Sequence, residues 1–533
     1  MIELIEKFII ELSALELDNF GEFEKFQRRF SKANKVAFFT NDNLIRVYHK
    51  LVKNRTIPKN PATEKLLTLK ATRSLSGIVV VSVLTKPYAC PGKCLYCPSQ
   101  ADVPKSYLKD EPAVMRAIIC KYDPYLQTIS RLKALNSVGH STDKICIRVV
   151  GGTWSYYPGQ YQTWFLKSVF AAANGIEKSL LSKYSMEELQ GLNESAKNRL
   201  VEISVETRQD YINLHEILRL RDLGVTKVEL GVQSIYDDVL KTNNRGNSDL
   251  QTVLATKLLK DAGFKVSYQM MLNLPGSDEA RDLHMFETLF SDAKYQPDHL
   301  KIYPLALLKE AEVYKMYLAG KFKPYTKEQL VDLITKIKCL IPYYTRVERV
   351  IRDIPADNIV EGGAKVSNLR QVVMAEMAKG KVQCHCVRCR EVSAGFDKSE
   401  KFQIYRENYK ASDGEEIFLS IENADRSKLY SMLRLRIPSN IFTKTSNPIS
   451  VLNNSSLIRE LHTYGPQMKI GQSEITAAQH QGFGKMLINE AEKITENEYS
   501  LNKIAVISGV GVRPYFRKFG YELISTYMVK KLS

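Results

Sequence analysis

The sequence of 533 residues lacks any apolar run that approaches the roughly 18 residues of a membrane-spanning helix. Its start, Met1 to Ile10, carries glutamates where a secretory signal peptide would be basic. Only nine cysteines are present, and six of them lie in two tight clusters, which favours metal or cluster ligation over disulfides. These features argue against a membrane-spanning or disulfide-rich secreted protein, and we expect a cytoplasmic location without membrane contact.

Acidic residues are outnumbered by basic ones, 59 against 76, which gives a net charge of +17. The excess favours a polyanionic partner such as nucleic acid, and a merely well-solvated surface is the alternative. Residues 1–75 mix basic and aromatic side chains, as in Phe26–Phe30 and Arg46–Lys50. This mixture favours a helical RNA-binding appendage in which cations contact phosphates and rings stack on bases. A helical cap with a solvated basic face is equally compatible with it.

Short apolar runs alternate with helical patterns between residues 76 and 340. Continuous apolar strands between helices are typical of a parallel sheet that is buried on both faces. The repeat predicts an α/β fold that begins with a partial (β/α)6 barrel and continues into further domains. The six runs are Ile78–Leu84, Ile145–Val150, Val201–Val205, Val228–Val232, Val266–Leu272 and His299–Tyr303.

A C-x3-C-x2-C loop, made by Cys90, Cys94 and Cys97, follows the first predicted strand directly. Three thiolates at this spacing can hold three irons of a 4Fe–4S cluster and leave the fourth iron open to a small molecule. Zinc is the main alternative, but structural zinc normally takes four protein ligands from paired C-x2-C units. The loop resembles that of the radical S-adenosylmethionine superfamily, which implies S-adenosylmethionine as a cofactor. Tyr96 holds the aromatic position that could face its adenine.

Polar or turn residues also follow the next predicted strands, where barrel enzymes place their chemistry. Gly151 and Gly152 resemble the glycine-rich motif that meets the methionine end of the nucleotide, with Thr153 in place of the usual acidic residue. Glycine lets the backbone approach a ligand closely. Glu206 and Gln233 are candidates to bind the ribose or the substrate, because both accept hydrogen bonds.

A second cysteine cluster, Cys384, Cys386 and Cys389, has the C-x-C-x2-C spacing of a zinc knuckle or clip. Its fourth ligand is not evident from the sequence, since His385 is too close to its neighbours to share the ion. A distant histidine is one candidate. The lone cysteines Cys120, Cys146 and Cys339, otherwise small core residues, are others.

The last part of the chain carries a glycine-containing helix start within Gln479–Glu490. The pattern Q-x-x-G-x-G before an amphipathic helix offers free backbone amides and a positive dipole end to a pyrophosphate. Leu457–Tyr464 precedes it as a strand candidate, and Lys503–Ser508 and Val512–Lys518 follow. This succession resembles the acetyl-coenzyme-A-binding half of GNAT acetyltransferases. Tyr515 stands where these enzymes place a phenol near the coenzyme sulfur, and a packing role is the alternative.

Over residues 75–533 the chain resembles the family of the Elongator catalytic subunit, in its single-chain bacterial or archaeal form. Stretches that carry this likeness include Glu111–Ala117, Gly139–Lys144 and His480–Gly484. The resemblance implies a 4Fe–4S cluster on Cys90, Cys94 and Cys97. It also implies acetyl-coenzyme-A contacts from a larger set: Lys144, Glu460, Leu461, His462, Thr463, Phe483, Gly484, Lys485, Met486 and Tyr515. The expected domains are 1–75 (basic appendage), 76–340 (barrel), 341–395 (linker with the cysteine clip) and 396–533 (GNAT).

The implied activity is modification of the wobble uridine in the tRNA anticodon loop, supplied with electrons by a reducing donor. A 5′-deoxyadenosyl radical would take a hydrogen from the acetyl group, and the carbon radical would add to carbon five of the uracil. Thioester hydrolysis would leave 5-carboxymethyluridine. The base must leave its stack to react, which is plausible in a loop. Two other functions stay open at this point: a protein lysine acetyltransferase and a non-catalytic tRNA-binding scaffold.

Overall fold

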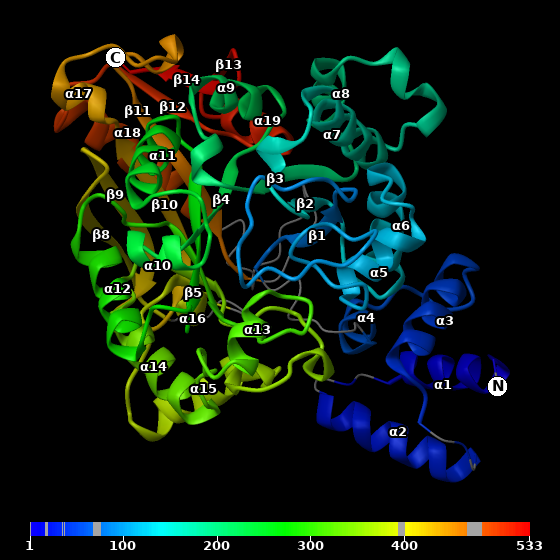
Figure 1. Cartoon of the computed structure of the whole chain (residues 1–533). Helices are drawn as coiled ribbons and strands as arrows, with labels where there is room; N and C mark the ends of the chain where they lie inside the picture. The colour runs from blue at the N-terminus through cyan, green and yellow to red at the C-terminus, as the bar shows by residue number, and fades with distance from the viewer. Residues whose placement is uncertain are drawn as a thin grey trace.

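The computed structural model describes residues 2–15, 17, 20–34, 36, 38–67, 76–392, 400–465 and 482–532. Two seven-stranded sheets form its centre, and helices cover them (Figure 1). Within these ranges no helix has both the length and the apolar character needed to span a membrane. The boundaries expected for the four domains stay predictions.

The first sheet is curled, entirely parallel and ordered as the chain runs, from β1 to β7. It confirms the α/β class and the partial parallel barrel, and it contains one strand more than the six runs predicted. The strands are β1 (Val79–Leu84), β2 (Lys144–Val150), β3 (Arg199–Thr207), β4 (Lys227–Gln233), β5 (Lys265–Leu272), β6 (His299–Pro304) and β7 (Arg346–Arg349).

Most of the helices connect these strands and pack on the outer face of the sheet, whereas α10 and α13 pack against the cysteine loop and α15 follows the last strand. Local signals set their ends: the Asn213 side chain caps the start of α9, and Gly224, at a φ of +81°, follows its end. The helices are α5 (Pro112–Ile119), α6 (Pro124–Ser137), α7 (Gly159–Asn174), α8 (Met186–Asn193), α9 (Leu214–Asp222), α10 (Asp237–Thr242), α11 (Asp249–Asp261), α12 (Glu279–Ser291), α13 (Val313–Leu318), α14 (Lys327–Leu340) and α15 (Leu369–Lys379).

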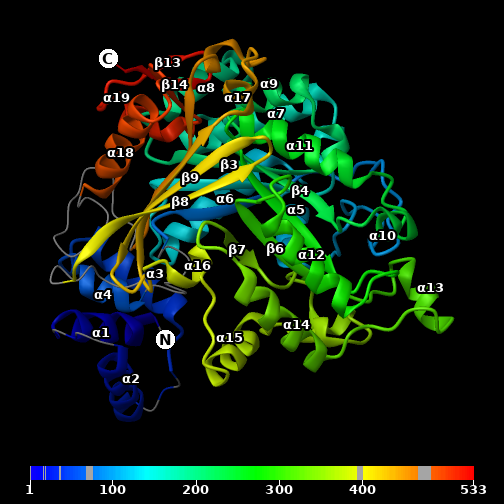
Figure 2. The same ribbon diagram turned by 90° about the vertical axis from the view of Figure 1, so that its left-hand side faces the viewer.

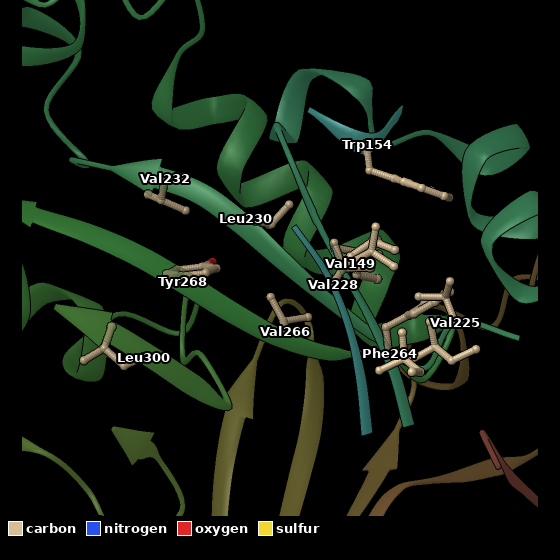
Figure 3. Packing of buried hydrophobic residues seen from close by; sticks show 14 of the residues in the cluster. Val149, Trp154, Val225, Val228, Leu230, Val232, Phe264, Val266, Tyr268 and Leu300 are labelled. Atoms are coloured by element: carbon tan, nitrogen blue, oxygen red, sulfur yellow. The ribbon is translucent and has the colours of Figure 1, made fainter. Parts of the chain in front are cut away.

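The two faces of the barrel sheet differ in chemistry. On β4, the outward-facing Val228, Leu230 and Val232 join one hydrophobic core with residues of neighbouring strands such as Val266 and Leu300 (Figure 3). Alternate positions on the same strand, Lys227 and Glu229, are buried and charged. The predicted burial of the sheet on both faces is confirmed for β4, but its inner face is charged rather than apolar, because inward-facing positions of this strand carry Lys227 and Glu229.

The second sheet has the order β13-β14-β12-β11-β10-β9-β8 and is antiparallel except between β11 and β12. Its long β8 and β9 cross the molecule beside the barrel (Figure 2). Its elements are β8 (Phe402–Ala411), β9 (Gly414–Asn423), β10 (Leu429–Ile437), α17 (Ser439–Thr443), β11 (Ser456–Thr463), α18 (Phe483–Asn497), β12 (Lys503–Val506), α19 (Arg513–Arg517), β13 (Glu522–Ile524) and β14 (Tyr527–Lys531).

The N-terminal segment forms α1 (Ile2–Ser13), α2 (Phe20–Asn34), α3 (Asn41–Lys53) and α4 (Pro61–Leu67), at one corner of the molecule (Figure 1). Phe26, Phe30 and Tyr48 belong to its hydrophobic core. The ring centroid of Phe8 lies 5.0 Å from those of Phe26 and Phe30. The idea that these rings stack on RNA bases is therefore wrong, because the helices can pack only by burying them. The role of the exposed basic residues stays a prediction.

Candidate active site

The cysteine loop lies where the carboxyl ends of the barrel strands surround a cavity of about 290 Å³. Cys90, Cys94 and Cys97 all line this first cavity. The loop is tightly fitted, since a methyl group at Gly92 would lie 2.6 Å from the Arg208 guanidinium and 3.4 Å from Cys94 Sγ. A larger residue at position 92 would have to displace the buried Arg208 guanidinium.

Positive charge faces the same loop. Arg245 is buried, and its Nη1 donates to Cys94 Sγ over 3.6 Å. Among the described residues no carboxylate forms a salt bridge with Arg245. The hydrogen bond from Cys97 and the charge of Arg245 hold the pKa of Cys94 below its ordinary value. A buried cation that faces thiols fits a site for an anionic thiolate-bound group.

The three thiols do not converge as ligands of one ion would. In the described part of the chain, the three cysteines whose sulfur atoms all lie within 4.8 Å of one another are those of the other cluster, Cys384, Cys386 and Cys389. An iron–sulfur cube needs one cysteine per iron rather than three at one point. The loop therefore fits a cluster better than a zinc ion.

Several other predicted residues share the first cavity. Tyr96 lines it, and its buried hydroxyl lies within hydrogen-bond reach of the Cys94 thiol. Gly152 and Gln233 also line it, and Gln233 ends β4 with a φ of +72°. Glu206 faces it too, and accepts from Lys301 Nζ and from the Gln269 amide, each over 3.1 Å.

Gly151 lies behind the cavity wall and does not line it. Its φ is +112°, and a methyl group there would lie 2.5 Å from Thr85 Oγ1. Its carbonyl accepts hydrogen bonds from Thr85 and from Tyr157, the latter over 3.1 Å. Gly151 therefore shapes the turn, whereas Gly152 presents its backbone to the cavity.

A second cavity, of about 640 Å³, lies at the opposite, amino ends of the barrel strands, against the second sheet. Residues that begin the strands line it, including Lys144 of β2, Glu202 of β3 and Lys265 of β5. It also brings together most of the predicted acetyl-coenzyme-A residues: Glu460, Leu461, His462, Thr463, Phe483, Gly484, Lys485 and Tyr515. Met486 is not among its lining residues and is 39% exposed.

Burial shapes the chemistry of this second cavity. It lowers the pKa of Lys144 and raises the pKa of Tyr515 to about 12. A methyl group at Gly484 would collide with the Tyr515 hydroxyl, so the start of α18 approaches that ring closely. Gly482, Phe483, Gly484 and Lys485 at this helix start line the cavity, and the amino end of a helix favours an anion. Gln479 to Gln481, the first part of the glycine motif, lie outside the described residues.

Charged residues of the barrel interior connect the two cavities, which the sequence analysis missed. From the second cavity, Glu460 contacts His299 Nε2 at 3.5 Å, and His299 Nδ1 contacts Glu348 at 3.0 Å. Glu348 pairs with Arg148 at 3.2 Å. Arg148 pairs with Glu229 at 3.3 Å, and Glu229 pairs with Lys301, which reaches Glu206 in the first cavity. The available signal was the presence of charged residues two positions apart in β4 and β6, at Lys227 and Glu229 and at His299 and Lys301.

The sulfur atoms of Cys384, Cys386 and Cys389 converge closely enough to hold one ion. Lys338 Nζ donates to Cys389 Sγ over 3.6 Å, and the thiols raise the pKa of this buried lysine against the effect of burial. No fourth described Cys, His, Asp or Glu joins the group. The suggestion that Cys120, Cys146 or Cys339 completes it is therefore wrong; Cys146 instead donates to Glu202 inside the barrel.

Comparison with known proteins agrees with this geometry. Residues 85–289 match the Radical SAM superfamily, and residues 297–379 match the Radical_SAM C-terminal domain. The chain is 42% identical to a tRNA uridine(34) acetyltransferase of Methanocaldococcus infernus, over 88% of each chain. It is 38% identical to human Elongator complex protein 3, over 87% of this chain and 86% of that protein. The chain belongs to the Elongator complex protein 3 family.

A solved member of the Elongator complex protein 3 family has the same fold. The structure of Methanocaldococcus infernus Elp3 with residues 1–46 deleted superposes with a TM-score of 0.74 at 39% identity, covering 86% of this chain and all of that one. As a radical SAM protein of this family, the chain uses a 4Fe–4S cluster and S-adenosylmethionine. Which of its residues hold them stays a prediction.

Proposed function

We propose that this protein modifies the wobble uridine, position 34, of tRNA to 5-carboxymethyluridine, and that it draws the added carbons from acetyl-coenzyme A. The observation that carries the proposal is the pair of cavities at opposite ends of the same strands, joined by a polar barrel interior. One cavity has the groups for radical chemistry, and the other has the groups for an acyl thioester. The relatives named tRNA uridine(34) acetyltransferase support the same substrate.

Each cavity has residues suited to its ligand. A 4Fe–4S cluster on Cys90, Cys94 and Cys97 would supply, when bound, the electron that cleaves S-adenosylmethionine to a 5′-deoxyadenosyl radical. The Tyr96 ring and the Gly152 backbone would orient the nucleotide, and Glu206 would accept a hydrogen bond from a hydroxyl of the ribose or the substrate. We place Gln233 at the same nucleotide.

In the second cavity, the amides from Phe483 to Lys485 would hold the pyrophosphate of acetyl-coenzyme A. Lys144 projects into this cavity from the barrel and would let the barrel respond to the bound coenzyme. Tyr515, protonated at neutral pH, can donate a hydrogen bond to the thioester.

We also propose that Cys384, Cys386 and Cys389 hold a structural zinc ion. Three convergent sulfurs supply three of its usual four ligands, and Lys338 compensates their negative charge. The fourth position would then be filled from outside the described residues or by solvent.

Anaerobic reconstitution tests the proposal. The full chain, loaded with iron and sulfide, is incubated with a reductant, S-adenosylmethionine, acetyl-coenzyme A and tRNA, and the nucleosides are identified by mass spectrometry. We expect 5-carboxymethyluridine from the native chain and from Cys339→Ala, whose exposed cysteine serves as the matched control. Cys94→Ala should yield none. Acetylation of a histone-type peptide that survives Cys94→Ala, without any modified uridine, would favour a lysine acetyltransferase instead. RNA binding with no modified product would favour a scaffold.

A further inference from the structure

A row of four aromatic side chains runs from the first cavity to α7; we call Tyr88, Tyr157, Tyr161 and Trp164 the aromatic row. Tyr88 stacks on Tyr157 with 4.9 Å between centroids, and Tyr157 stacks on Tyr161 with 5.0 Å. Tyr161 contacts Trp164 at 5.6 Å. The two ends, Tyr88 and Trp164, are 39% and 38% exposed. Both therefore offer free ring surface.

The row begins beside the first cavity, whose lining includes Cys90 and Gly152. Tyr88 lies two residues before Cys90, and a methyl group at Gly152 would lie 3.7 Å from the Tyr157 hydroxyl. Tyr156, which is 37% exposed, adds a further ring beside Tyr88 at 5.9 Å. A base stacked on Tyr88 or Tyr156 would thus lie beside the cysteine loop.

The other end of the row opens into a surface groove of about 830 Å³. Trp164, Lys167, Lys178 and Arg219 line this groove, and none of its described lining residues is acidic. Lys178 pairs with Asp123 at 2.5 Å. Lys167 and Arg219 are therefore the main sources of positive charge in the groove. Arg219 Nη2 is buried and has no hydrogen-bond partner among the described residues. The groove is therefore suited to an anionic ligand.

Aromatic rings beside cations are the combination that binds single-stranded nucleic acid, since every base can stack and every phosphate is negative. An apolar ligand would leave the cations unused, and an acidic peptide would leave the stacked rings unused. We propose that the aromatic row and the groove bind the single-stranded nucleotides next to the base that is modified. Bases stack on Tyr88 and Trp164, and phosphates contact Lys167 and Arg219. The identity of the RNA as an anticodon loop rests on the proposed function.

Binding of a fluorescent anticodon stem–loop RNA to the full chain, without cofactors, tests this surface. We expect Tyr88→Ala and Trp164→Ala each to weaken binding by roughly tenfold, because one base loses its stacking partner. Tyr88→Phe and Trp164→Phe keep a ring and should bind within about twofold of the native chain. Phe442→Ala is the matched control: Phe442 is 45% exposed, has Lys410 4.9 Å over its ring and belongs to α17, outside the row and groove.

A second RNA, with abasic nucleotides in the loop, separates stacking from folding effects. The alanine variants and the native chain should bind it equally, because the lost contact is already missing. Three results would overturn the proposal: native-like affinity of both alanine variants, an equal loss on the abasic RNA, or displacement of the RNA by polyglutamate at matched charge. Because no product is measured, these outcomes do not depend on catalysis. If the chain binds the RNA as expected but modifies no uridine, the proposed function is contradicted, whereas the proposed RNA-binding surface is still supported.

Discussion

Single residues around the cavities are constrained more by backbone shape than by side-chain chemistry. Gly151 illustrates this, because its φ of +112° and the neighbouring Thr85 leave no room for any other residue. Its carbonyl holds the hydroxyls of Thr85 and Tyr157, so the turn that presents Gly152 depends on it. Gly151 therefore determines the backbone conformation of the turn, independently of the ligand that the turn contacts.

Substituting alanine at Gly151 should lower the free energy of unfolding by about 1–3 kcal/mol, since the residue would be held at positive φ and against Thr85. The double variant with Thr85→Ala should stay destabilised, because the dihedral strain remains. Gly191→Ala in α8 is the matched control, with no atom within 4 Å of the added methyl group. Chemical denaturation measures all three. Equal stability of Gly151→Ala and Gly191→Ala would contradict the strain argument.

Glu64 provides a pH-dependent contribution to the N-terminal helices. Its pKa is lowered to about 2, chiefly by its hydrogen bond with His49 and further by Lys59. Because the folded pKa lies below the unfolded value, the stabilisation is complete above about pH 4.5 and is lost as the pH falls towards 2. Glu64→Gln should therefore lower the stability of α3 by about 1–2 kcal/mol at pH 6 and by much less at pH 3. Hydrogen exchange of the α3 amides measures this loss of stability. A stability difference between Glu64→Gln and the native chain that does not change with pH would contradict the role given to the Glu64 carboxylate.

At the level of helices and strands, the elements with a clear apolar pattern could be predicted from the sequence. All six predicted barrel strands are present, and β12 and α18 of the second sheet begin at or near the expected residues. β7 was not predicted, because Arg346-Val-Glu-Arg349 contains a single apolar residue. The charged barrel interior could not be predicted for a related reason: an isolated charged residue within an apolar strand does not reveal which residue of another strand it pairs with. Pairings such as Glu348 with Arg148 depend on tertiary contacts that no local pattern encodes.

The cysteine clip between the two sheets is a short element whose stability we expect to depend on metal. Cys386→Ser should abolish bound zinc, measured by mass spectrometry of the purified chain, and should lower Tm by several degrees. Cys120→Ser, which replaces a cysteine outside the clip, is the control and should keep the metal. Full zinc content in the Cys386→Ser variant would show that these thiols are not its ligands.

For the whole molecule, the interface between the sheets is held by buried charges. Asp298, at the start of β6, accepts from Arg459 of β11 over 2.9 Å and from the Val266 amide over 2.8 Å. Lys260 and Arg434 lie at 3.5 and 3.8 Å. None of these four side chains is more than marginally exposed. Removing Asp298 therefore leaves an excess of buried positive charge, which Glu416 and Glu460 balance only in part.

Asp298→Asn should cost about 3–5 kcal/mol and loosen the second sheet from the barrel, because three buried cations lose one of their carboxylate partners and share only Glu416 and Glu460. Asp332→Asn on α14 is the control: its pair with Lys336 has a similar distance, 2.7 Å, but both side chains are more than half exposed, so we expect a change below about 1 kcal/mol. Denaturant titration followed by fluorescence measures both. Equal effects would mean that the interface does not depend on this charge cluster.

The net charge of +17 leads to a prediction about binding by the whole chain. tRNA affinity should fall steeply and linearly on a log–log plot against salt, because bound phosphates release counterions. Fluorescence anisotropy over a range of salt concentrations gives the slope. Lys167→Gln should reduce the magnitude of that slope by about one, whereas Trp164→Phe should leave it unchanged. A flat salt response of the native chain would rule out an electrostatic interface.

The position of the two cavities at opposite ends of one set of strands also bears on reaction kinetics. The coenzyme would enter at the amino ends of the strands and the RNA at their carboxyl ends, so neither obstructs the approach of the other. Neither reactant has to wait for the other, so steady-state kinetics should follow a random-order scheme rather than an obligatory sequence.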